Sequence, residues 1–517
     1  MNILFVLYGG FNTNTANPLV LYARELHKLG HSCVIAVPTG LDAINQHENI
    51  NFKPARYEDV VSAPDSMFPD GRRADVIHAC TPRDIVRLFL TAYLSRYPTP
   101  LVFYLEDNES WISQNTLGLS DELLVQNIKE DITARLSKML SHPFHVDYFV
   151  GLADAVAVIQ EKMKVMVPPW VYCETIMIGL DIELFSPRLR DPELGKKYGI
   201  TNGEKVIVYH GGMNKFTRPE IRNLCEAVGL INSRGVPCKL LRCGPNALDF
   251  LAEVSPLSAA ATLDLGVLPK SELPDLLALA DVLVQPGQCN EFEEYRLPGK
   301  VPEFLAMGIP VVLPDVNISY LFRDGVDAVI LQSGTALEIA DKCMDLFLKP
   351  QKAAEIGSAG RKIAEQYFDV RNQARLLEQL YIKASRYFDE SVTRQVWSAN
   401  DYNVPVSSLL VKKLKLLASQ VNHNSQINPV KMLDSYADLI DTMERRVTGL
   451  ETVIVQNRLN IKDLENTISK LHKAIAVLED VILKHQEEIN RLLTSTSWRI
   501  TKPFRDMVNF IHRIIRR

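Results

Sequence analysis

Cysteines are sparse in this sequence, and their spacing excludes two common ways of stabilising a fold. The eight cysteines stand singly along 517 residues, with no Cys-x-x-Cys pair and no cluster of cysteine with histidine. A structural zinc site and a disulfide framework are therefore not indicated, and a reducing cytoplasm is the expected compartment.

Long apolar runs are also missing. No stretch reaches the roughly 18 uninterrupted apolar residues that would span a bilayer. Residues 1–10, MNILFVLYGG, carry no basic region and no small-residue cleavage site, so they predict a first strand rather than a signal peptide. We therefore expect a cytoplasmic chain without a membrane-spanning helix.

The composition is that of a globular protein, and it argues against nucleic acid as a partner. Of the 517 residues, 47% are hydrophobic and 23% are charged, and the formal net charge is -5. A mildly acidic chain is poorly matched to a polyanion, so no nucleic-acid partner is expected. The length is enough for about three domains.

The most informative stretch is residues 281–314, DVLVQPGQCNEFEEYRLPGKVPEFLAMGIPVVLP. Residues 282–284 predict a buried strand, and a polar loop follows over residues 285–295. A short helix then ends at Gly308, and residues 311–313 predict the next strand. Open α/β sheets bind ligands at the carboxyl ends of their strands, where this loop begins.

Two charged residues begin the short helix. Glu303 lies in its first turn, where a carboxylate can accept hydrogen bonds from ligand hydroxyls. Lys300 lies one turn earlier and can neutralise a phosphate, which the helix amino terminus also favours. An ordinary crossover without chemistry is the alternative interpretation.

The residues of this stretch carry a family resemblance. The motif is Pro298-x-Lys300-x-x-Glu303-Phe-Leu-Ala-Met-Gly308-x-Pro310-Val-Val. It resembles the retaining glycosyltransferases of family 4, which have the two-domain GT-B fold. The resemblance implies that Glu303 binds the ribose hydroxyls of a nucleotide-diphospho-sugar and that Lys300 binds its phosphates.

The family has a second glutamate, with seven residues between the two, and this chain has Tyr295 at that position. Glu294 is the expected catalytic replacement, holding the hydroxyls of the donor sugar. Glu293 is the other candidate, and the choice between them stays open. The departure also leaves room for a protein that has the fold without the activity.

The start of the chain predicts a strand, a glycine turn and a helix. Gly9-Gly10 follows the strand, but the loop is not Gly-x-Gly-x-x-Gly, so no dinucleotide cofactor is indicated. By the resemblance, this loop lies on the acceptor side, and so do Glu106 and Asp107, which follow a strand over residues 101–105. A solvated loop is the alternative for these two carboxylates.

A second strand and glycine turn opens the next domain. Residues 205–209 predict the strand, and Gly211-Gly212 follows it. Backbone amides can approach a pyrophosphate at such a turn, and Lys215 and Arg218 supply positive charge. The family generally has an arginine and a lysine here, and this chain has Gly212 at the expected arginine position. The catalytic basic role is therefore assigned to Lys215 and Arg218.

The resemblance adds four donor-binding residues: Arg242, Gly244, Leu268 and Asn317. Arg242 and Gly244 repeat the pattern of a strand followed by glycine. Leu268 lies in a loop expected to hold the nucleotide base, and Asn317 is expected to close the phosphate end. The sequence has no convincing Asp-x-Asp motif, so we expect no metal and no cofactor other than the donor.

The predicted fold class is α/β, with two Rossmann-like domains, a long helical coiled coil and an amphipathic carboxyl-terminal helix. The predicted boundaries are 1–188 for the acceptor-side domain, 189–388 for the nucleotide-sugar domain, 389–430 for a linker, 431–493 for the coil and 494–517 for the tail. The last helix of the second domain, near residues 370–388, is expected to cross back onto the first.

Beyond residue 430 apolar residues alternate at spacings of three and four. One seam is Leu433, Ile440, Val447, Ile454, Ile461, Ile468, Ile475, Ile482 and Ile489, and the other is Tyr436, Met443, Leu450, Asn457, Leu464, Leu471, Leu478, His485 and Leu492. A period of 3.5 predicts a left-handed coiled coil. β-Branched residues in one seam and leucines in the other favour a parallel dimer, with a trimer or tetramer left open.

The tail is basic and amphipathic. Its basic residues are Arg499, Lys502, Arg505, Arg513, Arg516 and Arg517, and Trp498 lies at the edge of the apolar face. It resembles a short motif at the end of many bacterial polysaccharide glycosyltransferases. An anionic inner-membrane surface is the expected partner, which would place the protein on the inner face of the cytoplasmic membrane. Docking on another protein is the alternative.

The function expected from the sequence is a retaining, metal-independent glycosyltransferase. It would move a sugar from a nucleotide-diphospho-sugar to a lipid-linked or growing bacterial surface polysaccharide, of the O-antigen or capsule type. The alternative is a non-catalytic scaffold of the same fold that organises other polysaccharide-synthesis enzymes. An epimerase of sugar nucleotides is a third, weaker hypothesis.

Overall fold

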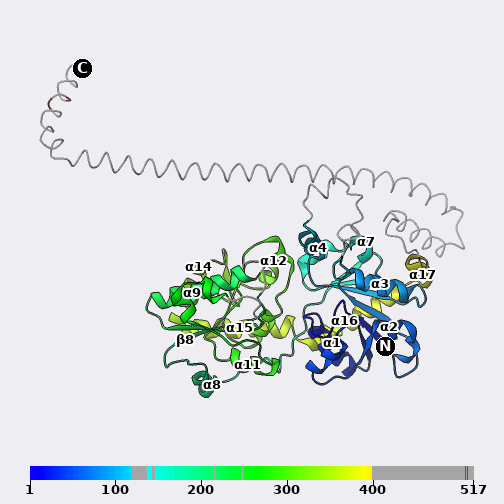
Figure 1. The fold of residues 1–517 in the computed structure, drawn as a ribbon, viewed down its shortest axis with the longest axis horizontal. Coiled ribbons are helices and arrows are strands. Elements are labelled where there is room, and N and C mark those ends of the chain that lie inside the picture. Colours follow the sequence, from blue (N-terminus) through cyan, green and yellow to red (C-terminus); the bar gives the residue numbers. More distant parts are fainter. Residues whose placement is uncertain are drawn as a thin grey trace. The chain divides into compact units, whose positions relative to one another are not determined.

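The fold comes from a computed structural model that describes residues 1–118, 137–142, 146–168, 171–213, 217–245, 250–398, 507 and 509 (Figure 1). Two parallel sheets organise these residues. We call the part built on the first sheet the first lobe and the part built on the second sheet the second lobe.

The first lobe contains a seven-stranded parallel sheet in the order β3-β2-β1-β4-β5-β6-β7. Its strands are β1 (Asn2–Val6), β2 (Ser32–Val37), β3 (Lys53–Arg56), β4 (Val76–Cys80), β5 (Leu101–Leu105), β6 (Ala155–Val158) and β7 (Tyr172–Thr175). Its helices are α1 (Ala16–Lys28), α2 (Tyr57–Ser62), α3 (Asp84–Leu94), α4 (Glu109–Leu117) and α7 (Val146–Val150), with short 3-10 turns η1 (Leu41–Gln46), η2 (Pro64–Ser66) and η3 (Glu161–Met166). All residues of β1, β4 and β5 are buried, as expected for parallel strands covered on both faces.

The second lobe contains a six-stranded parallel sheet in the order β10-β9-β8-β11-β12-β13. Its strands are β8 (Lys205–His210), β9 (Cys238–Cys243), β10 (Thr262–Asp264), β11 (Val282–Val284), β12 (Val311–Pro314) and β13 (Val329–Leu331). Its helices are α8 (Pro192–Lys197), α9 (Arg218–Ser233), α10 (Pro256–Ala260), α11 (Leu273–Leu277), α12 (Glu291–Tyr295), α13 (Lys300–Ala306), α14 (Ala336–Leu348) and α15 (Pro350–Tyr367). The 3-10 turns η4 (Leu251–Glu253), η5 (Lys270–Glu272) and η6 (Asn317–Leu321) complete it.

Helix α16 (Val370–Tyr387) follows the second lobe in sequence but packs on the first, beside α1 (Figure 1). The Tyr381 hydroxyl lies 2.9 Å from Nδ1 of His78 on β4, and Glu378 Oε1 lies 2.8 Å from Nε2 of His31. The backbone N–H of Met177 also donates to Gln373 Oε1, at 3.0 Å. The chain thus returns to the first lobe, as the sequence predicted.

The predicted α/β fold with two Rossmann-like domains is confirmed by the two sheets. The sheets change between β7 and β8, and the predicted boundary at residues 188 and 189 lies in that connection. One local prediction was wrong: the loop predicted over residues 285–295 contains α12. The Asn290 side chain caps this helix by accepting from the Glu293 N–H at 2.9 Å.

The remaining predictions concern the end of the chain. Helix α17 (Glu390–Ser398) lies inside the predicted linker. The helix suggested there over residues 408–421, the coiled coil over 431–493 and nearly all of the tail lie outside the described residues.

Candidate functional site

The strand order of each sheet indicates where a ligand binds. In the first sheet the order reverses between β1 and β4, and in the second it reverses between β8 and β11. Doubly wound sheets bind ligands beyond the carboxyl ends of the strands at such a point. In the second lobe the segments there are the Gly211-Gly212 turn after β8 and residues 285–303 after β11.

The turn after β8 requires glycine. Gly211 has a φ of +149°, and a Cβ there would lie 2.7 Å from Cε of Lys300. Gly244, after β9, has a φ of +128°, and a Cβ there would lie 2.4 Å from the Gly211 carbonyl oxygen. The two glycine turns and the Lys300 side chain therefore pack tightly together, and any side chain at either position would separate them.

Arg242 supports the two glycine turns through hydrogen bonds to their backbone. Its side chain is 0% exposed. Its guanidinium is 2.7 Å from Asp264 Oδ2, and it donates to the carbonyl oxygens of Gly211 at 3.1 Å and Pro245 at 2.9 Å. The sequence placed Arg242 among the donor-binding residues, but its bonds are to the protein, so its contribution to a donor site is the support of both glycine turns.

Glu303 lies at the same place, in the first turn of α13. Its Oε2 is 2.7 Å from Nε2 of His210, the last residue of β8, and its side chain is only 13% exposed. Burial alone would raise the pKa of Glu303, but the His210 imidazole and the ammonium groups of Lys270 and Lys300 hold it below its usual value. Glu303 is therefore an ionised, largely enclosed carboxylate, and not the open one that its position in the sequence indicated.

Lys300 begins α13 and lies against the Gly211 turn, with its Nζ 5.1 Å from the centre of the Tyr209 ring. Burial, and then the charge of Arg296, lower the pKa of Lys300 to about 8. A lysine with this pKa is mostly charged at neutral pH and gains from an added anion.

Arg296 is a cation that the sequence reasoning missed. Its Nη1 is 2.6 Å from Oε1 of Glu293, whose side chain is 3% exposed. Burial would lower the pKa of Arg296, but the carboxyl groups of Glu293, Asp107 and Glu220 keep it above its usual value. Arg296 stands four residues before Lys300 in the Arg-Leu-Pro-Gly-Lys segment, and this spacing was a signal that could have found it.

Glu220 on α9 is another residue that the sequence did not indicate. Burial, and then the Glu293 carboxylate, raise the pKa of Glu220 to about 8. The Arg296 and Lys300 charges act in the opposite direction. The second lobe therefore gathers Glu220, Glu293, Arg296, Lys300 and Glu303, and we call these five residues the charged cluster.

The first lobe contributes carboxyl groups from the segment after β5. Thr15 Oγ1 donates to Glu106 Oε2 at 2.5 Å, and burial nevertheless raises the pKa of Glu106 to about 8. Burial, and then the nearby Glu109 carboxylate, raise the pKa of Asp107 to about 6. Arg296 opposes that shift, so Asp107 of the first lobe interacts electrostatically with the charged cluster of the second.

Gly9 and Gly10 form the turn after β1, as the sequence indicated. The Gly10 carbonyl oxygen accepts from the N–H of Thr13 at 3.1 Å and from its hydroxyl at 2.8 Å. A Cβ on Gly10 would lie 2.9 Å from the Thr39 carbonyl oxygen, so this turn packs closely on the end of β2.

Two other predicted residues have partners away from the charged cluster. Glu294 Oε1 is 2.6 Å from Nζ of Lys162 in the first lobe. Arg218, at the start of α9, forms an ion pair with Glu253. Lys215 lies outside the described residues.

Asn317 and Leu268 occupy positions that fit supporting roles. Asn317 is buried with a φ of +46°, and its Nδ2 donates to the Glu293 carbonyl oxygen at 3.4 Å. Leu268 is half-buried in the loop after β10, and Gly266 of that loop accepts from the Gly244 N–H at 2.6 Å. Asn317 thus contacts the backbone of the charged cluster, and the Leu268 loop contacts the glycine turns.

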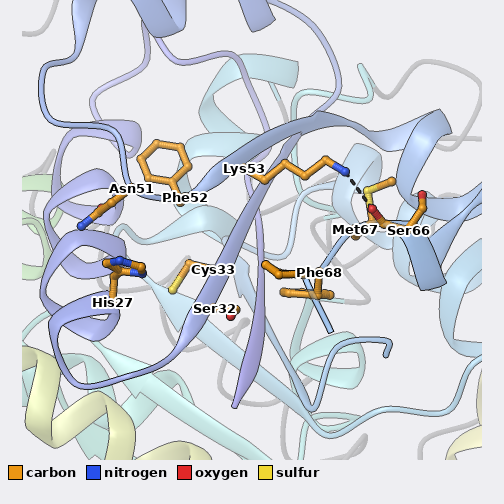
Figure 2. A pocket seen from close by; sticks show the side chains of 10 residues that line it. His27, Ser32, Cys33, Asn51, Phe52, Lys53, Ser66, Met67 and Phe68 are labelled. Carbon is orange, nitrogen blue, oxygen red and sulfur yellow. Dashed lines mark hydrogen bonds between the residues drawn. The ribbon is translucent and has the colours of Figure 1, made fainter. Parts of the chain in front are cut away.

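A cavity of about 370 Å³ lies in the first lobe, and Figure 2 shows side chains that line it. It opens at the amino ends of β2 and β3, the opposite edge of the sheet from Glu106 and Asp107. Its lining residues are His27, Ser32, Cys33, Asn51, Phe52, Lys53, Ser66, Met67, Phe68 and Pro69. In this cavity Lys53 Nζ donates a hydrogen bond to the Ser66 carbonyl oxygen at 2.8 Å.

Neither a metal site nor a membrane-spanning helix is found among the described residues. They contain no group of three or more His, Cys, Asp and Glu side chains arranged to hold a metal ion. No helix in the part of the chain that the structure describes combines the length and apolar character needed to cross a membrane.

A family comparison matches part of the second lobe. Residues 204–348 match the family model of glycosyl transferases group 1. This range includes both glycine turns and the whole charged cluster. The similarity to glycosyl transferases group 1 is thus confined to the second lobe.

A comparison by sequence also finds a relative that matches part of the chain. The putative glycosyltransferase EpsD of Bacillus subtilis (strain 168) is 26% identical over 220 residues, which are 41% of this chain and 54% of EpsD. The chain thus matches about half the length of that relative.

Comparison with solved structures establishes the fold. The HepE protein of Anabaena, solved with UDP-glucose, has a TM-score of 0.55 at 17% identity, over 73% of this chain and 98% of HepE. A glycosyltransferase of Rickettsia africae has a TM-score of 0.57 at 14% identity, over 74% of this chain and 98% of its own. The two lobes therefore have the GT-B architecture.

Proposed function

We propose that the protein is a retaining glycosyltransferase of the family 4 type that uses a nucleotide-diphospho-sugar. The observation that carries the proposal is that Lys300 lies against the Gly211 turn at the switch point of the second sheet, with Arg296 near enough for its charge to act on Lys300. Two cations and the backbone amides of a glycine turn suit a diphosphate, whose charge grows as the sugar leaves.

The other residues of the site take roles around the diphosphate. Glu303 accepts hydrogen bonds from the ribose hydroxyls, because it stays ionised and lies one turn beyond Lys300. Glu293 is better placed than Glu294 to meet the donor sugar, since it belongs to the charged cluster while Glu294 pairs with Lys162. Asp107 and Glu106 face the acceptor.

Positive charge from Lys300 and Arg296 is the reason to expect transfer without a divalent metal. Transfer that is unchanged by a chelator such as EDTA would agree with this expectation, and transfer that stops and returns on adding Mg²⁺ would contradict it. The cations would then have to share the diphosphate with a metal ion.

The test of the donor site is a calorimetric titration of the full chain with UDP, GDP and the corresponding nucleosides. The proposal predicts that at least one nucleoside diphosphate binds much more tightly than its nucleoside, because most of the site's charge faces the phosphates. Absence of binding by every nucleotide would instead favour the non-catalytic scaffold, the second candidate function, which the Tyr295 position suggested.

Diphosphate affinity should fall as the pH rises from 7 to 9. Lys300 is charged below its pKa of about 8 and loses its charge above it. Glu220 and Glu106, each with a pKa of about 8, also become negative over the same range. If only the ammonium form of Lys300 binds well, affinity should drop by about tenfold at pH 9.

A Lys300→Arg variant separates the two causes of this pH dependence. Arginine stays charged over the whole range, so a smaller fall in the variant assigns the difference to Lys300. An unchanged profile would show that Lys300 does not contact the phosphates in the charged form. The measurement is the calorimetric affinity for UDP or GDP at each pH.

The acceptor and the assembly are proposed from the sequence alone. We propose that the acceptor is a lipid-linked or growing bacterial surface polysaccharide. We also propose that the coil over 431–493 joins copies of the chain, with a dimer favoured. The tail over 494–517 would bind an anionic inner-membrane surface or, as the alternative, one of the other enzymes of polysaccharide synthesis.

Ending the chain after residue 428 should convert an oligomer into a monomer, because the seam of the coil buries its apolar residues only against a partner helix. Light scattering gives the mass of both forms in solution. A matched chain ending after residue 493, which keeps the coil and lacks the tail, should stay oligomeric. An unchanged mass in the shorter form would show that the two lobes associate by themselves.

A further inference from the structure

We propose that Gln160 and Lys162 of the first lobe form a latch on Glu294, which positions α12 and with it Glu293 and Arg296. In this role Glu294 is a positioning residue held by the first lobe, and not a ligand of the donor sugar. The inference rests on the proposed transferase function, and it assigns roles to two first-lobe residues that nothing in the motifs indicates.

Three consecutive first-lobe residues reach the second lobe just after β6. Lys162 Nζ is 2.6 Å from Glu294 Oε1, and Gln160 Nε2 donates to the Glu294 backbone carbonyl oxygen at 2.8 Å. Between them, the Glu161 N–H donates to the Tyr320 hydroxyl on η6 at 3.2 Å. The side chain and the backbone of Glu294 are thus both held from the opposite lobe.

The two contacts of the latch differ in burial. Gln160 is 0% exposed, and its Oε1 has no hydrogen-bond partner among the described residues. Burying an amide costs free energy, and the hydrogen bond from its Nε2 to Glu294 offsets part of that cost. Lys162 is 32% exposed and Glu294 is 36% exposed. An ion pair this open adds little to folding stability, so its value lies in fixing the position of α12.

Glu293 and Glu294 cannot do the same work, because neighbouring residues on a helix point in directions about 100° apart. Glu293 points into the charged cluster and pairs with Arg296, and Glu294 points to the first lobe. Asn290 caps the same helix by accepting from Glu293 N–H, and Asn317 contacts the Glu293 carbonyl oxygen. A shift of α12 therefore moves Glu293 and Arg296 together.

The contacts of the latch exist only while the two lobes are in contact. Domain closure around a ligand commonly completes a site in two-lobed enzymes, through a few contacts made only in the closed form. The latch would let first-lobe contact orient Glu293 and Arg296 for transfer. The Gly211 turn and Lys300 lie in the second lobe and do not touch the latch, so nucleotide binding should depend on the latch only through the position of Arg296.

The test is a charge exchange in the full chain, with Lys162→Glu, Glu294→Lys and the double variant. Each single variant should lower kcat by about tenfold, and the double variant should recover to within about threefold of the unchanged protein. UDP affinity by calorimetry should fall by less than about threefold in the single variants, less than kcat does, since Lys300 and the Gly211 turn are untouched and Arg296 is displaced but keeps its charge. Lys164→Glu is the matched control, because Lys164 lies on the same turn, is 35% exposed and pairs within that turn with Glu161.

A second measurement needs no activity. Hydrogen exchange over residues 290–296 should become faster in each single variant and return toward its original rate in the double variant. Faster exchange in both single variants without recovery in the double variant would contradict a latch based on the ion pair.

The outcomes separate this inference from the proposed function. If the double variant stays as impaired as Glu294→Lys, the Glu294 carboxylate itself is needed, as a donor-sugar ligand would be, and the latch is wrong. Normal kcat and normal exchange in Lys162→Glu would also overturn it while leaving the transferase function intact. If the unchanged protein binds no nucleotide, the function fails, and hydrogen exchange alone still decides the latch.

Discussion

Replacing Glu303 with alanine should lower kcat/KM for sugar transfer by about a hundredfold. The carboxylate is ionised, 13% exposed and 2.7 Å from His210, so it is fixed at the place where we propose that the ribose hydroxyls of a donor bind. Hydrogen bonds to a charged group contribute about 1.5–3 kcal/mol each, and loss of one or two gives an effect of this size. Steady-state kinetics with an accepted donor measure it.

Two variants control for effects on folding. Glu303→Gln keeps the shape of the side chain and tests the charge alone. Glu338→Ala removes a first-turn carboxylate of α14 that accepts from the backbone of Gln332 and Ser333, away from the charged cluster. Glu338→Ala should lower the melting temperature and leave transfer almost unchanged. Full turnover by Glu303→Ala would remove Glu303 from the site.

Removing the charge of Lys300 or Arg296 should weaken binding of a nucleoside diphosphate by tenfold or more and leave nucleoside binding nearly unchanged. Each of these cations can form a charge-assisted hydrogen bond to phosphate, worth about 1.5–3 kcal/mol. Lys300→Met is the better substitution at the first position, because it keeps the stem that packs on the Gly211 turn. Calorimetric titration with UDP and uridine, or GDP and guanosine, gives both affinities.

Arg218→Ala is the control for this second prediction. Sequence reasoning gave the phosphate role to Lys215 and Arg218, but Arg218 already pairs with Glu253. Its loss should therefore change diphosphate affinity by less than about threefold, as expected for a partly exposed ion pair. A larger loss in Arg218→Ala than in Lys300→Met would return the phosphate role to the segment named from the sequence.

The sequence predicted the central strands of both sheets, because parallel strands covered on both faces are continuous apolar runs. The outer strands β3, β7, β10 and β13 were not predicted. Residues 101–105 and 282–284 became β5 and β11 with the same bounds. The glycine turns followed from the same reasoning, since each lies where a buried strand ends. The helix that returns to the first lobe was also predicted, within one residue of its observed end.

The partners of the charged residues were not predictable in the same way. Arg296 and Glu293 are three residues apart, but their enclosure depends on Glu220 from α9 and Asp107 from the other lobe. Glu294 and Lys162 are 132 residues apart, and no local pattern relates them. Helix α12 could have been predicted from the sequence, because an asparagine three residues before a glutamate is a signal for a helix start.

The state of Glu303 shows the same limit. The sequence correctly predicted that Glu303 lies in the first turn of a helix. That position alone suggested an exposed carboxylate, whereas the side chain is largely buried. The imidazole that pairs with it comes from the end of β8, 93 residues earlier in the chain. Burial and partners of this kind arise from the parallel alignment of β8 and β11, which brings the ends of both strands to one edge of the sheet.

The central claim is that this chain transfers a sugar from a nucleotide donor with retention of configuration. The most direct measurement incubates the full chain with a panel of nucleotide-diphospho-sugars and a bacterial lipid-linked glycan fraction, and assigns the anomeric configuration of the new linkage by NMR. The account predicts that an α-linked donor gives an α-linked product. A β-linked product would contradict retention, and the absence of any product, together with no nucleotide binding, would contradict the transferase function itself.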